Sequence, residues 1–184
     1  MAYFGENWDD AEFPLAYLIT IRTYGTWLHG DERGSIDTHD GYNIVGADRR
    51  PANVNLETMM RTNMRSKPVR LKKAQQRVVH QAIQEVCKYR DFTLYALNVK
   101  PTHTHLVVRA QVKPEKIAEA LKSYATRRLR EKGWFKESSP WSRGRSRRYL
   151  WKANHLSGAV DYVLYSQSDD VIFDSWYESR FHDK

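Results

Sequence analysis

The segment from Lys100 to Val108 holds two histidines, His103 and His105, with one residue between them. The apolar residues that follow predict a β-strand, in which successive side chains point to opposite faces. The two imidazoles therefore share a face and can both reach one divalent ion. The same spacing also fits ordinary cross-strand hydrogen bonding. Because two protein ligands are too few for a catalytic metal, a third must come from elsewhere in the chain.

A second set of candidate residues lies near the C-terminus, where Ser157 to about Gln167 predicts a helix that carries Tyr162 and Tyr165. A tyrosine hydroxyl can attack a phosphodiester and hold the cut strand as an ester. Because the pKa of a free tyrosine is about 10, this reaction needs a cation that polarises the phosphate. A polar residue about one turn later could supply the third metal ligand. The competing interpretation is that both tyrosines pack in the core.

Several other functional classes lack their key residues. Cys87 is the one cysteine, which excludes an internal disulfide and a cysteine-based zinc site. The HExxH, GxxxxGK[ST] and GxGxxG motifs are absent, and with them the zincin, P-loop and dinucleotide-binding classes. No apolar run approaches the roughly 18 residues of a membrane span, and the acidic first residues do not resemble a secretory signal. We expect a cytoplasmic protein without a membrane partner.

Positive charge is concentrated in the middle of the 184-residue chain, whose formal net charge is +8. Residues 61–152 hold 24 basic and 6 acidic side chains, a net charge of +18, whereas residues 1–60 and 153–184 have net charges of −6 and −4. The hydrophobic fraction of 41% is too high for a disordered chain. The basic middle favours a polyanion partner such as nucleic acid. The alternative is a solvated face of lysines and arginines.

The pattern of apolar residues predicts one α/β domain over residues 1–184. Strands are expected at 14–21, 92–99, 104–110 and 148–152, and helices at 71–90, 114–131 and 157–167. The order β-α-β-β-α-β followed by a last helix is the ferredoxin-like, RRM-like pattern with an antiparallel sheet. Residues 22–66 are polar and rich in glycine, and we expect a long loop there. A short C-terminal tail is expected from about residue 170.

Taken together, these features resemble the REP-associated tyrosine transposases of the HUH single-tyrosine superfamily, which is found in bacterial insertion sequences. The segment from Lys100 to Val107 is similar to the family's Pro-Asn-His-x-His-Leu stretch, with Thr104 where the family usually has an apolar residue. Residues 148–151 followed by 160–167 are similar to its last strand and tyrosine helix. Residues 21–35 are similar to the opening segment of one branch. The resemblance covers roughly residues 14–170.

This resemblance implies the HUH endonuclease fold and Mg²⁺- or Mn²⁺-dependent cleavage of single-stranded or hairpin DNA. It implies a 5′-phosphotyrosine intermediate and a free 3′-hydroxyl, with rejoining as the reverse reaction. His103 and His105 take the positions of the metal ligands, Tyr162 that of the nucleophile and Gln167 that of the third ligand. The protein would act on DNA of the bacterial nucleoid, as a monomer or a homodimer.

Two alternatives stay open on the last helix. Relatives often place the third ligand four residues after the tyrosine, where this chain has Ser166. Gln167 comes five residues after Tyr162, about 140° from the direction of the tyrosine on a regular helix, so it can serve only if the helix ends or loosens there. The second alternative has Tyr165 as the nucleophile and Asp169, four residues later, as an oxygen ligand for a hard cation.

The basic middle of the chain would contact DNA phosphates, and nearby aromatic side chains would stack on unpaired bases. At least one of the tryptophans is expected in the core. The residues expected to contact DNA are Arg65, Lys67, Lys72, Arg127, Arg128, Arg130, Lys132, Trp134, Trp141, Arg143, Arg145, Arg147 and Arg148.

The favoured hypothesis is a metal-dependent, sequence- or hairpin-specific single-stranded DNA endonuclease and strand transferase, which acts in DNA transposition. The alternative from another class is a non-catalytic RRM-like protein that binds DNA hairpins. Two further hypotheses are a replication-initiator or relaxase-type HUH nuclease and a basic structural protein whose histidine pair is incidental.

Overall fold

The fold is described from a computed structural model that covers residues 13–34, 51–165 and 172–173. These residues belong to two compact units. The core unit contains residues 13–24 and continues from Val69, and the insertion unit contains residues 25–68. None of the helices in the described ranges is both long and apolar enough to cross a membrane.

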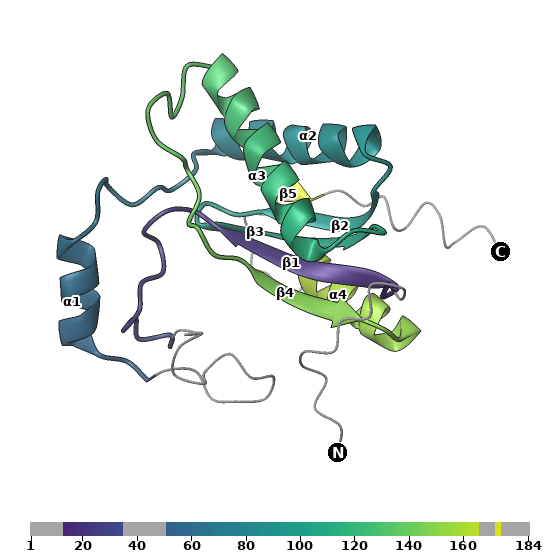
Figure 1. Ribbon diagram of the computed structural model, residues 1–184, viewed down its shortest axis with the longest axis horizontal. Helices are drawn as coiled ribbons and strands as arrows, with labels where there is room; N and C mark the ends of the chain where they lie inside the picture. Colours follow the sequence, from purple (N-terminus) through teal and green to yellow (C-terminus); the bar gives the residue numbers. More distant parts are fainter. Residues whose placement is uncertain (1–12, 35–50, 166–171, 174–184) are drawn as a thin grey trace. The chain divides into compact units, whose positions relative to one another are not determined.

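The core unit is an antiparallel sheet with helices on both faces. Its elements in chain order are β1 (Ala16–Arg22), α2 (Lys73–Tyr89), β2 (Thr93–Val99), β3 (His103–Arg109), α3 (Pro114–Glu131), β4 (Ser146–Leu150), α4 (Ala153–Leu164) and the two-residue β5 (Ile172–Phe173). The strand order is β4-β1-β3-β2-β5, and each neighbouring pair runs antiparallel. The predicted ferredoxin-like α/β fold with a C-terminal tyrosine-bearing helix is therefore confirmed (Figure 1).

The helices α2 and α3 cover one face of the sheet, as Figure 1 shows. On α2 the buried apolar residues recur every three or four positions, as expected for a helix with one face in the core. They are Val79, Ala82, Ile83, Val86 and Cys87. Pro114 begins α3, where its fixed φ suits the first turn and its missing N–H costs no hydrogen bond. The apolar stripes of α2 and α3 thus pack against one face of the sheet.

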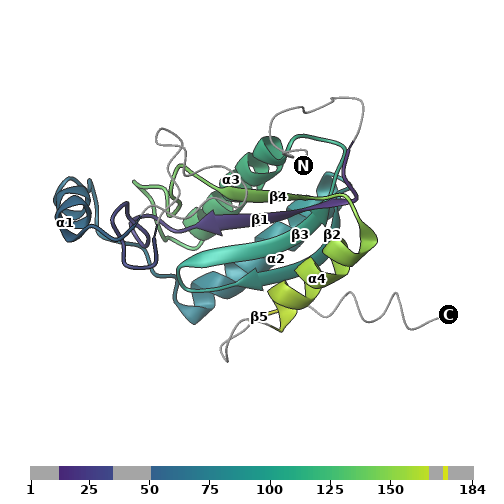
Figure 2. The same ribbon diagram turned by 90° about the horizontal axis from the view of Figure 1, so that it is seen from below.

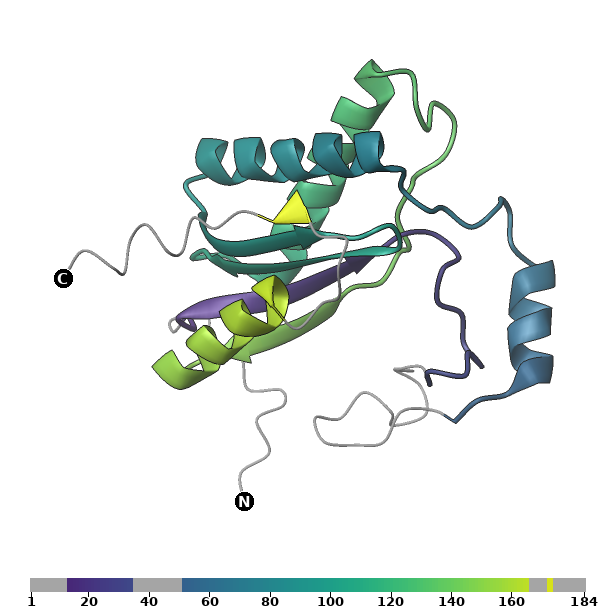
Figure 3. The same ribbon diagram turned by 180° about the vertical axis from the view of Figure 1, so that it is seen from behind.

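The opposite face is covered by α4, which crosses the strands in Figure 2 and Figure 3. Its buried side chains Val160 and Val163 pack with Ala16, Val107 and Leu150 of the sheet. The helix begins at Ala153 and ends at Leu164, whereas the sequence predicted residues 157–167. The prediction missed the first turn, in which residues 153–155 are exposed, although Leu156 packs against the core cluster one turn before Val160.

The insertion unit contains a helix, α1 (Val54–Thr62), and the expectation of a long loop over residues 22–66 is wrong there. Asn53 caps the helix, because its Oδ1 accepts a hydrogen bond from the Leu56 N–H at 2.9 Å. Glu57 and Arg61, one turn apart, form an ion pair. None of the α1 residues is buried. Leu56, Met59 and Met60 recur at helical spacing, but the helix has only nine residues and lies in a polar, glycine-rich stretch, which is why the sequence pattern predicts a loop.

A glycine allows the chain to turn within the insertion unit. Gly30 has φ +91°, a left-handed conformation that L side chains rarely adopt, and its carbonyl accepts a hydrogen bond from the Asn53 N–H at 2.9 Å. The insertion leaves the core after Tyr24 and returns at Val69. These two core residues are joined directly, because the Val69 N–H donates to the Tyr24 carbonyl at 2.9 Å.

Candidate active site

The two histidines lie on β3, between β1 and β2 and on the face that α4 covers. His103 is paired with Arg22 of β1, and His105 is paired with Thr20 of β1 and Asn98 of β2. The imidazole rings lie side by side, with centroids 4.6 Å apart and planes at 74°. His105 is 8% exposed, and His103 is partly exposed. The alternation of a strand thus brings both rings to one place.

Thr104, between the histidines, points to the opposite face. Its side chain is fully buried, and it is paired with Ile21 on one side and Val99 on the other. Among the described residues its hydroxyl has no hydrogen-bond partner. The polar residue at this usually apolar position therefore leaves the histidine face unchanged.

Threonine hydroxyls orient both imidazoles. The Nδ1 atom of His105 lies 2.8 Å from Oγ1 of Thr20, and Nδ1 of His103 lies 2.9 Å from Oγ1 of Thr102. A hydrogen bond to one ring nitrogen sets the direction in which the other nitrogen points, as is usual for histidine ligands of metals. In both rings Nε2 is then the atom that would bind a cation.

The environment keeps His105 neutral. Burial, and then the positive charges of His103, Arg22 and Lys100, lower the pKa of His105 to about 3. A neutral imidazole is the form that binds metals, so His105 needs no deprotonation near neutral pH. The effect also places two cationic side chains, Arg22 and Lys100, close to the histidines. Sequence reasoning missed both, although they stand at the ends of their strands beside the histidine stretch.

This pKa shift predicts a loss of stability in acid. An unfolded histidine takes up a proton below about pH 6.5, whereas folded His105 does not until about pH 3. The stabilisation is therefore complete above pH 6.5 and is lost as the pH falls. Between about pH 7.5 and pH 5, His105 alone should lower the free energy of unfolding by about 2 kcal/mol. Urea unfolding in EDTA at the two pH values measures this change.

The comparison for this test is the His105→Gln variant. Over the same pH range its free energy of unfolding should fall by about 2 kcal/mol less than that of the wild type. The matched control is His155→Gln, since His155 is exposed on α4 and its replacement should leave the acid sensitivity unchanged. Equal acid sensitivity in His105→Gln and the wild type would contradict the assignment.

Tyr162 lies against the histidine pair. It projects from α4, and its ring meets that of His105 edge to face, with centroids 5.5 Å apart and planes at 72°. Tyr162 is 40% exposed, so it is not sealed in the core. Tyr165, the alternative nucleophile, caps the end of α4 and is 60% exposed. The fold thus brings Tyr162 to His103 and His105, from which it is far apart in the sequence.

Asn98 is a site residue that sequence reasoning missed. It is fully buried, and its Nδ2 donates to the carbonyl of Val163, the residue after Tyr162, at 3.0 Å. Its Oδ1 is buried and has no hydrogen-bond partner among the described residues. A buried asparagine in an otherwise apolar strand is the signal that could have revealed it. The Asn98 amide thus links the part of α4 that carries Tyr162 to β2, at the position paired with His105.

The proposed third ligands, Ser166, Gln167 and Asp169, lie outside the described residues. Within the described ranges, no cluster of three or more His, Cys, Asp or Glu side chains is arranged to hold a metal ion.

Several of the arginines expected to contact DNA form ion pairs within the core unit. Glu115, in the first turn of α3, lies 3.3 Å from Arg145 and 3.1 Å from Arg147. Arg128 reaches Glu85 of α2 at 3.2 Å and Glu131 at 2.8 Å. These three guanidinium groups are therefore already engaged by carboxylates of the core unit.

The remaining predicted DNA contacts are distributed over both units. Arg65 and Lys67 belong to the insertion unit. Lys132, Arg130, Arg143 and Arg148 are exposed on the core unit, and Lys72 and Trp134 also lie there. Arg127 is exposed on the core unit as well, and it lies 4.0 Å from Glu131.

Trp141 is a core residue. It is 6% exposed, and its backbone pairs with Thr23 beyond the end of β1. The indole N–H donates to the Lys122 carbonyl at 3.2 Å and to Thr126 Oγ1 at 3.1 Å. The ring offers almost no surface on which a base could stack. The expectation that at least one tryptophan belongs to the core is confirmed.

Comparisons with known proteins agree with the transposase resemblance. The model of the family described as "Transposase IS200 like" matches residues 52–166, which include His103, His105, Tyr162 and Ser166. The match leaves out β1 at one end and Gln167 and Asp169 at the other. A search of curated proteins found no match.

Two solved structures are similar to this chain. One is a REP-associated tyrosine transposase bound to a REP hairpin, with 13% identity over 80% of this chain and a TM-score of 0.47. The chain spans 63% of the length of that protein. The other is a candidate transposase from Deinococcus radiodurans, with 12% identity over 91% of this chain and all of the other, and a TM-score of 0.45. Since the family match covers more than half of the sequence, this chain belongs to the IS200-like transposase family.

Proposed function

We propose that the protein is a metal-dependent, sequence- or hairpin-specific endonuclease and strand transferase for single-stranded DNA, acting through a 5′-phosphotyrosine intermediate. The observation that carries this proposal is the packing of Tyr162 against His105, beside His103, with tyrosine and histidine ring centroids 5.5 Å apart. A nucleophile and two potential metal ligands are thereby combined at one accessible place. The family supplies the biological context, which is DNA transposition.

His103 and His105 would hold the Mg²⁺ or Mn²⁺ ion, with Ser166, Gln167 or Asp169 as the third ligand. The residues present fit such an ion, because both rings are oriented through Nδ1 and burial keeps His105 neutral. An oxygen ligand from residues 166–169 would suit a hard cation. When bound, the ion would polarise the scissile phosphate and stabilise the charge that develops on it.

Tyr162 would act as the nucleophile. Its hydroxyl oxygen attacks the phosphorus and loses its proton to solvent, and the bond from phosphorus to the 3′ oxygen breaks. The 3′ oxygen leaves and takes a proton, which yields a free 3′-hydroxyl, while the 5′ phosphate stays on the tyrosine. Arg22 and Lys100 lie close enough to lower the pKa of His105, so they could also neutralise the phosphate oxygens. Attack by a 3′-hydroxyl on the phosphotyrosine reverses these steps and rejoins DNA.

The proposed partners are single-stranded or hairpin DNA in the bacterial cytoplasm, bound by a monomer or a homodimer. The test uses oligonucleotides that carry the inverted repeats flanking the gene, labelled at one end. With Mn²⁺ we expect an SDS-resistant adduct that keeps a label placed at the 3′ end, because the tyrosine holds the 5′ phosphate of the downstream strand. A label at the 5′ end should be released on a shorter DNA with a free 3′-hydroxyl.

EDTA should abolish the adduct, because the reaction needs the cation. An adduct that kept the 5′-end label would contradict the polarity of cleavage. Tight binding of the same oligonucleotides with no adduct in Mn²⁺ or Mg²⁺ would instead support the alternative, a non-catalytic RRM-like hairpin-binding protein.

A further inference from the structure

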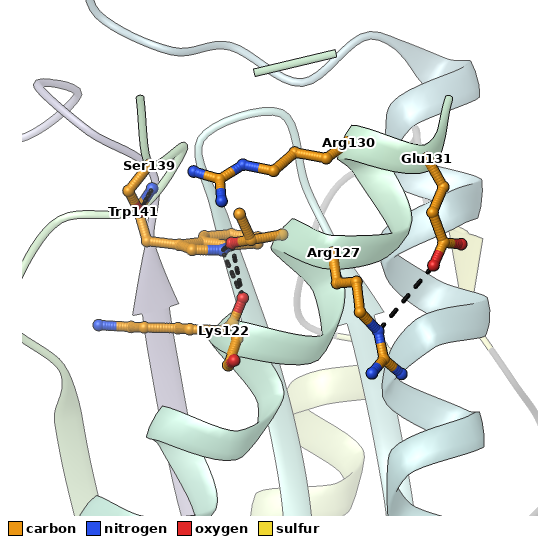
Figure 4. A pocket seen from close by; sticks show the side chains of 8 residues that line it. Lys122, Arg127, Arg130, Glu131, Ser139 and Trp141 are labelled. Carbon is orange, nitrogen blue, oxygen red and sulfur yellow. Dashed lines mark hydrogen bonds and ion pairs between the residues drawn. The ribbon is translucent and has the colours of Figure 1, made fainter. Parts of the chain in front are cut away.

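A second candidate binding site lies on the outer side of α3, away from the histidines. It is an open pocket of about 580 Å³ between the second half of α3 and the segment 139–141. We call it the α3 pocket, and the side chains that define it are Ser123, Thr126, Arg127, Arg130, Ser139 and Trp141. Figure 4 shows Arg130 extending toward Ser139 and Trp141, whereas Arg127 points toward Glu131.

The wall of the α3 pocket is held firmly. Trp141 is hydrogen-bonded to α3 through its indole N–H, and the Thr126 hydroxyl donates to the Lys122 carbonyl at 2.7 Å. The Lys122 ammonium donates to three successive carbonyls, those of Ser142, Arg143 and Gly144, at 2.9, 3.3 and 2.8 Å. These bonds tie the segment after Trp141 to the helix. The backbone wall of the pocket is therefore preformed.

The charges that line the pocket suit an anion. Arg127 and Arg130 are cationic, and Glu131 is the one acidic residue of the lining. The Lys122 ammonium is already engaged by three carbonyls, and burial lowers its pKa to about 8. Glu131 lies 4.0 Å from Arg127 and 2.8 Å from Arg128, so its charge is shared. Arg130 has no ion pair with a described residue, and only its Nε is engaged, by the Phe135 carbonyl at 3.1 Å. Its terminal N–H groups can therefore bind two oxygens of a phosphate.

The lining of the α3 pocket suits a phosphate group better than a base. The Trp141 ring is almost fully buried, so it offers no surface on which a base could stack. Its N–H is already hydrogen-bonded and cannot donate to the edge of a base. Guanidinium and hydroxyl groups recognise phosphate without reading sequence. The volume is sufficient for one nucleotide unit of a strand.

The pocket is connected to the candidate active site through the end of β1. Trp141 pairs with Thr23, and the Ser142 N–H donates to the carbonyl of Arg22 at 3.0 Å. Arg22 is in turn paired with His103. The histidines face α4, whereas α3 lies on the other face of the sheet. A strand that contacts both places would have to bend around this end of the sheet, which flexible single-stranded DNA can do.

We propose that the α3 pocket binds a phosphodiester of the single-stranded DNA substrate, away from the bond that is cut. The proposal rests on the proposed function for the identity of the ligand. It assigns Arg127 and Arg130 to a defined anchoring site that holds the strand while Tyr162 acts on another phosphate.

The test measures binding of a fluorescein-labelled oligothymidylate in EDTA, so that no cleavage occurs. Arg130→Gln should weaken binding by about tenfold, because a charge-assisted hydrogen bond is lost. It should also lower the slope of log affinity against log salt by about 0.7, the contribution of one phosphate contact on a single strand. Arg127→Gln, on the exposed face of α3, should act in the same direction without disturbing the wall.

The matched control is Lys136→Gln, which removes one exposed positive charge near the pocket but not from its lining. It should change the affinity by less than about twofold. Thermal unfolding of each variant establishes that it is folded. An abasic oligonucleotide should show the same loss with Arg130→Gln, since the site recognises phosphate.

Equal effects of Lys136→Gln and the two arginine variants would overturn the proposal, as would an unchanged salt slope. A loss seen with oligothymidylate but not with the abasic strand would overturn phosphate recognition. Failure of the proposed function is seen separately, in the adduct assay. A protein that binds through the α3 pocket but forms no adduct contradicts only the catalytic proposal.

Discussion

Replacing Tyr162 with phenylalanine is expected to abolish the covalent protein–DNA adduct and to reduce cleavage by at least about a thousandfold. The substitution removes only the hydroxyl oxygen, and the ring can still pack against His105. DNA affinity measured in EDTA should therefore stay within about twofold of the wild type. The adduct is measured on SDS gels with a 3′-labelled oligonucleotide, and affinity by fluorescence anisotropy.

Tyr165→Phe is the decisive comparison, because Tyr165 is three residues away at the end of the same helix. It should keep the adduct. Tyr89→Phe is the matched control, since Tyr89 ends α2 on the other face of the sheet and is 85% exposed. Loss of the adduct in Tyr165→Phe together with its retention in Tyr162→Phe would transfer the role of nucleophile to Tyr165.

The second large effect is expected when both histidines are replaced by alanine. The His103→Ala, His105→Ala variant should lose Mn²⁺ binding in calorimetry and at least about a hundredfold in cleavage rate, because the cation loses two of its ligands. DNA binding in EDTA should be largely retained, since phosphate contacts elsewhere do not depend on the metal. The measurement pairs calorimetric titration with the adduct assay.

His155→Ala serves as the control for the histidine variant, because His155 is exposed and lies on α4 near the start of the helix. It should bind Mn²⁺ and cleave DNA like the wild type. Circular dichroism distinguishes loss of the metal from loss of the fold. Cleavage that persists in a folded double variant would rule out the metal role of the histidines.

Most of the fold could be predicted from patterns within single helices and strands. The stripe from Val79 to Cys87 on α2 and the proline that begins α3 are signals within one element, and both predicted elements are present. The rings of His103 and His105 are neighbours because strand alternation requires it. The helix α1 was missed because its nine residues give only a short periodic signal within a polar, glycine-rich stretch.

Contacts between distant segments could not be predicted in the same way. Nothing local to Arg145 or Arg147 shows that Glu115 binds both, about thirty residues earlier in the chain. The same holds for the hydrogen bond from Asn98 to Val163, which spans 65 positions. Counting charges in the sequence therefore predicts that the surface is positive, but it does not reveal which arginines are already ion-paired. That distinction separates Arg130 from Arg128 as a candidate DNA contact.

The hydrogen bond between Val69 and Tyr24 has a consequence for how the chain could have evolved. This hydrogen bond holds together the two core residues that flank residues 25–68. The insertion therefore joins the core at the same place whatever its own sequence or length. A segment with closed ends can be gained, lengthened or exchanged between lineages without a change in the register of β1 or α2. Selection on the insertion can then proceed independently of selection on the strand that bears the histidines. The insertion is therefore the part of this chain in which we expect lineages to diverge most freely.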